Sequence, residues 1–143
     1  MNEPKLGPQR SEWLYPFGAL KKAGATLVGS SDWSVSSMNP LEAIQTGVTR
    51  QDIADTSGRV LTPQHRLEVM DLVRAYTVNG AYAAFDEASS GTLSVGKRGD
   101  IVVLDRDITT VAPTEIAAGK VLATFIEGIA VHEGEGLPPP SGG

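Results

Sequence analysis

Asp32 is the residue whose type and position in this sequence first suggest chemistry. It lies in GSSDWS, residues 29–34, directly after the apolar run ATLV, residues 25–28. Because this run is short, apolar and followed by a glycine, it predicts a buried β-strand. Enzymes with an α/β fold often keep a catalytic group at the carboxyl end of a strand. The alternative is a loop aspartate that only caps its own turn.

Few other residues offer chemistry. The chain has two histidines, His65 and His132, and no cysteine, so disulfides and thiolate metal sites are excluded. We expect both histidines to be ordinary surface residues. A catalytic zinc usually has three protein ligands and an open position. Asp32 alone therefore does not make a metal site.

The composition describes a soluble globular chain. Of 143 residues, 41% are hydrophobic and 20% are charged, which fits one domain with a core. The net charge is −5 and no basic cluster is present, which argues against a nucleic-acid partner. No apolar run approaches the roughly 20 residues of a membrane helix. The first ten residues carry no signal-peptide core, so we expect a cytoplasmic location.

Three capped or interrupted helices are predicted in the first part of the chain. Pro16 and Gly24 bracket the first, and Asn39 with Pro40 begins the second. Thr62 is the expected N-cap of the third, which shows an apolar face at residues 69, 72, 73 and 76. We expect Asn79-Gly80 to interrupt this helix and a short helix to follow over residues 81–85.

The later part of the chain reads as β-structure. A short strand is possible around Leu93 and Val95, and residues 101–105 and 120–126 form apolar strands. Glu127-Gly128 predicts a tight turn into a further strand, residues 129–133. The apolar run at 25–28 would need neighbours on both edges, and residues 1–86 supply none. The sequence therefore indicates a piece of a larger fold.

Three segments resemble a known family when taken in order. They are GATLVGSSDWSVSSMNPLEAIQTGVTR, RAYTVNGAYAAF and GTLSVGKRGDIVVLDRD. They are similar to the C-terminal quarter of a metal-dependent amidohydrolase, in the branch called amidohydrolase 3 or YtcJ-like. The resemblance covers roughly residues 6–133. One departure is Ser34, since the family loop often has proline at this position.

The resemblance implies an α/β fold, a (β/α)8 barrel beside a small β-sandwich, of which this chain would be the C-terminal portion and incomplete alone. It implies an irregular lead-in over 1–14, the last barrel strand and closing helices over 15–86, sandwich strands over 87–134 and a disordered tail over 135–143. Asp32 would be the metal ligand and catalytic base, beside a divalent metal, most commonly zinc. Trp33 would line a substrate pocket or pack against the barrel rim. The other ligands would lie upstream of this chain.

Two functions follow as alternatives. The first is the C-terminal part of a hydrolase that cleaves C–N bonds of small amide-type molecules with metal-activated water. This chain alone would then be inactive, and its partner would be the missing N-terminal part or another copy of itself, since exposed strand edges recruit strands. The second is a non-catalytic small protein derived from this region, which needs no metal and has a binding or assembly role.

Overall fold

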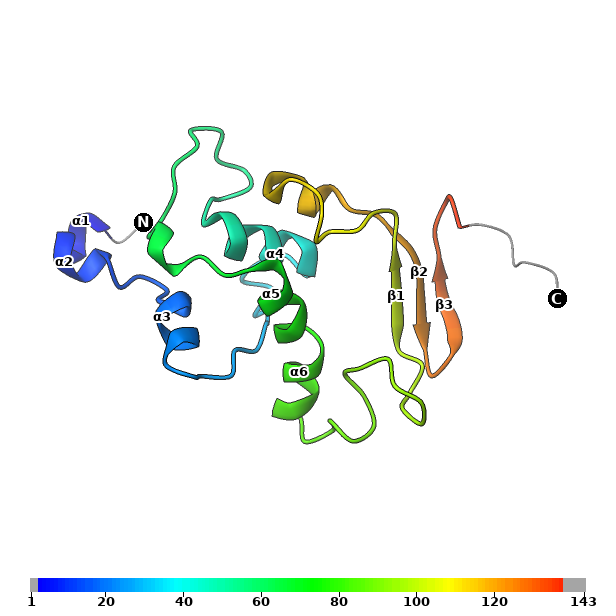
Figure 1. Cartoon of the computed structure of the whole chain (residues 1–143). Helices are drawn as coiled ribbons and strands as arrows, with labels where there is room; N and C mark the ends of the chain where they lie inside the picture. Colours follow the sequence, from blue (N-terminus) through cyan, green and yellow to red (C-terminus); the bar gives the residue numbers. More distant parts are fainter. Residues whose placement is uncertain (1–2, 138–143) are drawn as a thin grey trace.

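The computed structural model describes residues 3–137 of the chain. Helices occupy the first part and a three-stranded antiparallel sheet the last, side by side in Figure 1. The elements are α1 (Glu3–Leu6), α2 (Pro8–Ser11), α3 (Phe17–Lys22), α4 (Pro40–Thr49), η1 (Pro63–His65), α5 (Val69–Ala75), α6 (Val78–Ala83), β1 (Ile101–Leu104), η2 (Pro113–Ala118), β2 (Val121–Ile126) and β3 (Ile129–Glu133). No helix among them is both long and apolar enough to span a membrane.

Helix α4 forms as its sequence predicts. The Asn39 side chain accepts a hydrogen bond from the Leu41 N–H at 3.0 Å, and Pro40 occupies the first turn, where its missing N–H costs nothing. The helix ends at Thr49, and Arg50 after it takes the left-handed conformation with φ 59°. Helix α3 likewise stops before Gly24, whose φ of 85° favours glycine.

The core lies between α4 and the segment that connects β1 to β2. Leu41 and Ile44 of α4 pack with Ile108 and Ile116, and Ile116 is fully buried. The predicted apolar face of α5 covers the same cluster with four partly buried side chains, Val69, Leu72, Val73 and Tyr76. The Gln45 side chain also accepts a hydrogen bond from the Ala117 N–H at 2.8 Å, which joins α4 to η2.

The sheet has the order β1–β2–β3, with both pairs antiparallel. The predicted hairpin is confirmed: Ile126 pairs with Ile129 across Glu127-Gly128. Both turn residues have positive φ, 51° and 79°, as a tight two-residue hairpin turn requires. The Asp100 carboxylate accepts a hydrogen bond from the Glu127 N–H at 2.9 Å and fixes this turn to the start of β1.

Several local predictions differ from the structure. Residues 25–28 form no strand, and within residues 3–137 the only sheet is that of β1–β3. A strand needs another strand to pair with, and the described residues place none beside this segment. Leu93 and Val95 also form no strand and are exposed. The lead-in is not wholly irregular, because α1 and α2 occupy residues 3–11.

The helix predicted from Thr62 begins later. Thr62 is left-handed, with φ 44°, and makes no capping bond. A single turn, η1, follows, and α5 starts only at Val69, where the Asp71 carboxylate accepts a hydrogen bond from the Glu68 N–H at 3.0 Å. The predicted interruption also lies earlier than expected: α5 ends at Ala75, and Asn79 is inside α6.

The barrel and the two-sheet sandwich are not seen as such among the described residues, which hold one sheet and its helices. The physical reason is the same for both, because a closed barrel or a sandwich needs more strands than residues 3–137 supply. The predicted disordered tail falls largely on residues 138–143, which lie outside the described part of the chain.

Candidate functional site

Asp32 stands on an exposed turn between α3 and α4. Its φ of 49° is left-handed, a conformation that aspartate tolerates better than most residues. The turn is closed locally: the Asp32 N–H donates to the Ser30 hydroxyl at 3.3 Å, and the Val35 N–H donates to the Asp32 carbonyl at 2.7 Å. The main chain thus holds Asp32 while its side chain remains open to solvent.

The segment that leads to this turn is bound to the junction between α5 and α6. The Gly29 N–H donates to the Ala75 carbonyl at 3.0 Å, and the Asn79 Nδ2 donates to the Leu27 carbonyl at 2.8 Å. The sequence predicted only a helix break at Asn79 and missed this contact. The sequence YTVNGA, residues 76–81, contained a hint of this contact. Its Asn-Gly pair favours a helix break, and the asparagine amide can donate a hydrogen bond to another segment.

A cavity of about 420 Å³ lies beside this segment. Segment 27–30 forms one wall. Thr46 of α4, Leu72 of α5 and Tyr76, which directly follows α5, line other parts of the cavity. Burial raises the pKa of the Tyr76 hydroxyl. Asp32 and Trp33 do not line the cavity. The hollow is therefore separate from the carboxylate that the sequence singled out.

Trp33 is 65% exposed, and its apolar neighbours Val35 and Met38 are exposed as well. The loop thus exposes three large apolar side chains within six residues of sequence.

The described residues do not fit a metal by themselves. Among residues 3–137 no three His, Cys, Asp or Glu side chains lie together. His132 is an exposed residue of β3, as predicted. His65 is buried instead of exposed, because its ring lies 5.9 Å from that of Trp13 and its Nε2 is 3.1 Å from the Glu12 carbonyl oxygen. We therefore derive no metal chemistry from this chain alone.

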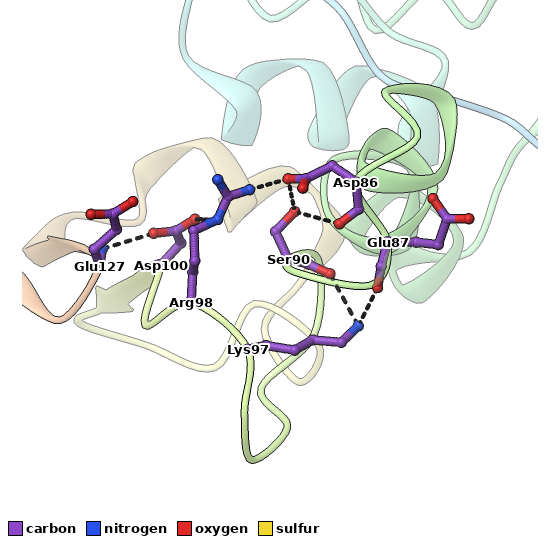
Figure 2. Close-up of polar contacts among 7 residues, drawn as sticks. All are labelled: Asp86, Glu87, Ser90, Lys97, Arg98, Asp100 and Glu127. Carbon is purple, nitrogen blue, oxygen red and sulfur yellow. Dashed lines mark hydrogen bonds and ion pairs between the residues drawn. The ribbon is translucent and has the colours of Figure 1, made fainter.

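A polar cluster links the end of α6 to the sheet (Figure 2). Arg98 bonds to the Asp86 carboxylate and lies 3.6 Å from that of Asp100. The Ser90 hydroxyl and then Arg98 lower the pKa of Asp86, outweighing the opposing effect of desolvation. Lys97 Nζ donates to two backbone carbonyls, those of residues 87 and 90, at 2.6 and 3.1 Å. These charged side chains bond to one another and to the backbone of residues 86–100, so we interpret the cluster as structural.

Comparison with known proteins gives a consistent family. The amidohydrolase family matches residues 1–132. The chain is 31% identical to N-substituted formamide deformylase of Arthrobacter pascens, over 86% of the chain and 22% of that protein. It is 35% identical to Protein LONG AFTER FAR-RED 3 of Arabidopsis thaliana, over 87% of the chain and 21% of that protein. It is 26% identical to the putative amidohydrolase YtcJ of Bacillus subtilis strain 168, over 90% of the chain and 24% of that protein.

The fold agrees with a solved relative. The crystal structure of an amidohydrolase from Thermotoga maritima MSB8 superposes with a TM-score of 0.51 and 23% identity, over 80% of this chain and 24% of that one. The chain thus spans about a fifth to a quarter of the length of the relatives it matches. On the match over residues 1–132, the chain belongs to the amidohydrolase family.

Proposed function

We propose that this chain is the C-terminal part of a hydrolase that cleaves C–N bonds of small amide-type molecules with metal-activated water. One observation carries the proposal: Asp32 follows a segment bound to the α5–α6 junction and stands exposed on its turn, within a chain that matches the family over residues 1–132. The name of the Arthrobacter pascens relative supports the bond type, since deformylation of an N-substituted formamide breaks a C–N bond.

In this proposal Asp32 is a metal ligand and the catalytic base, and the remaining donors come from the rest of the family fold. Family members are typically metal-dependent, and zinc is the metal we propose. Trp33, exposed beside Asp32, would contact the substrate. Residues 15–86 would supply the last barrel strand and the closing helices, and residues 87–134 would supply strands of the sandwich.

The partner would be the N-terminal part of the same fold. The accessible surface of the chain is 9788 Å², whereas a folded monomer of 15.0 kDa exposes about 7,000 Å². Exposed apolar side chains such as Val28, Trp33, Val35 and Met38 lie on or near the segment that carries Asp32. A surface of this kind marks a contact site.

A chimera tests the proposal. The aligned segment of the Arthrobacter pascens deformylase is replaced by this chain, and turnover of an N-substituted formamide is measured together with bound metal. We expect measurable turnover and a loss of about 10²–10⁴-fold with Asp32→Asn, because that variant removes a proton acceptor. Asp55→Asn is the matched control, since Asp55 is an exposed aspartate whose carboxylate bonds Ser57 of its own loop.

Two results would contradict the proposal. One is a folded chimera that binds metal yet turns over nothing. The other is an Asp32→Asn chimera as active as the Asp55→Asn control. A folded, inactive chimera would favour the alternative, in which the exposed apolar surface serves assembly without catalysis.

A further inference from the structure

The break between α5 and α6 allows the Ala75 carbonyl to accept a hydrogen bond from outside the helices. Helix α5 ends at Ala75 and α6 begins at Val78, and between them Thr77 has the non-helical angles φ −127° and ψ −100°. In a continuous helix the Ala75 carbonyl would accept the N–H of residue 79. Here it accepts the Gly29 N–H at 3.0 Å instead.

Asn79 makes the second bond to the same segment. Its Nδ2 donates to the Leu27 carbonyl at 2.8 Å, across 52 positions of sequence. Residues 27 and 29 are thus bound by one junction, through a carbonyl and an N–H respectively. The junction provides bonds of the kind that a neighbouring strand would give to this edge of the segment.

Tyr76 completes the contact. A Cβ atom at Gly29 would lie 2.5 Å from the Tyr76 ring, closer than real contacts allow, so the ring packs directly on the backbone there. Gly29 stands three residues before Asp32, a span of at most roughly 10 Å. The place where the Asp32 turn begins is therefore set by the residues that bind positions 27–29.

We infer that Asn79 and Tyr76 are positioning residues that fix the segment from which Asp32 reaches the reaction site. Asn79 bonds the segment and Tyr76 packs on it. The inference rests on the proposed role of Asp32 and adds to it the side chains that hold the carboxylate in place. A small misplacement of a catalytic group strongly lowers the reaction rate. Loss of Asn79 or Tyr76 should therefore slow the reaction.

Amide hydrogen exchange on the full chain tests the anchoring without any assay of activity. Asn79→Asp keeps the shape of the side chain but removes the donor. We expect the Gly29 amide to exchange about five- to tenfold faster, as the loss of one hydrogen bond implies. The Gly134 amide, which donates to the Leu122 carbonyl at 2.8 Å in the sheet, should keep its rate.

Gln64→Glu is the matched control. Gln64 also donates an amide to a backbone carbonyl, that of Glu12 at 3.2 Å, so the chemical change is the same at a different place. It should leave the Gly29 amide unchanged. Equal acceleration of the Gly29 and Gly134 amides in Asn79→Asp would mean a loss of global stability only and would overturn the inference. Unchanged protection of Gly29 would overturn it too.

A second variant tests the anchoring independently, in case Asn79→Asp does not fold. Gly29→Ala leaves Asn79 intact and displaces the segment from the Tyr76 ring. It should also speed exchange across residues 27–30 while the sheet amides keep their rates. Wild-type exchange over these residues would contradict the role of Tyr76.

Kinetics of the chimera link the anchoring to catalysis. We expect Asn79→Asp to lower kcat at least tenfold while KM changes less than threefold, because the variant moves the catalytic group and spares substrate contacts. A normal kcat with a loosened Gly29 amide would overturn the inference. An inactive wild-type chimera would contradict the proposed function, and exchange would still decide the anchoring.

Discussion

At the scale of single residues, Arg50 shows how much one side chain holds together. It is 7% exposed and donates from Nε to the Leu61 carbonyl at 3.1 Å, and from Nη2 to the Leu14 carbonyl at 3.1 Å and the Thr62 hydroxyl at 2.7 Å. Burial lowers the pKa of its guanidinium. The planar fork of arginine presents several donors in fixed directions and here reaches acceptors on two segments at once.

Arg50→Lys should therefore destabilise the chain by about 2 kcal/mol, because at least one buried acceptor loses its donor. The free energy of unfolding in urea measures this. Arg10→Lys is the control, since Arg10 makes an exposed bond to the Leu6 carbonyl, and it should change the free energy by less than about 0.5 kcal/mol. Equal effects of both substitutions would refute the role of Arg50.

Asp105 gives a prediction about pH. Hydrogen bonds from the Arg106 guanidinium and the Lys120 N–H lower the pKa of its carboxyl from 3.8 to about 2. Since the folded pKa lies below the unfolded one, the stabilisation is complete above about pH 4 and is lost as the pH falls toward 2. Urea midpoints measured from pH 5 to pH 2 should fall less steeply in Asp105→Asn. Parallel curves for wild type and variant would count against this.

At the scale of elements, the connection between β1 and β2 does most to join the sheet to the helices. Ile116 of η2 is fully buried against α4, beside Ile108. Ile116→Ala should cost about 3 kcal/mol through lost burial and a residual cavity. Unfolding in denaturant measures it, with Val95→Ala as an exposed control expected to be near neutral. A loss below about 1 kcal/mol would mean that the core rearranges around the cavity.

At the scale of the whole molecule, the sheet exposes several large apolar side chains. On the sheet Val102, Ile129 and Val131 are 56%, 68% and 56% exposed. Both β1 and β3 are edges of the sheet. Such a sheet invites association along its face and edges.

We expect the isolated chain to self-associate and Val131→Lys to weaken that association, because a charge on the exposed strand opposes pairing. Sedimentation velocity over a concentration series measures it. Val95→Lys, at an exposed loop position outside the strands, is the control and should not alter it. A wild-type chain that stays monomeric across the series would refute this expectation.

Signals within a few residues were readable from the sequence. Asn39 and Pro40 began α4, Gly24 followed α3, and Glu127-Gly128 made the hairpin turn. Each of these acts through its own backbone or a neighbour one turn away, so the local sequence determines the outcome. Three segments taken in order, the first of which contains Asp32, also carried the family resemblance, which the match over residues 1–132 confirmed.

Contacts between distant segments were decided only by the tertiary structure. Thr62 looked like an N-cap, but its hydroxyl is bonded to Arg50, and α5 begins at Val69. Residues 25–28 looked like a strand, but no strand within residues 3–137 pairs with them, and the α5–α6 junction binds the segment through Asn79 instead. The sequence by itself determined the family and the candidate Asp32. The tertiary structure decided what binds the segment before Asp32, because that depends on a hydrogen bond between Asn79 and Leu27, 52 positions apart, which no local pattern encodes.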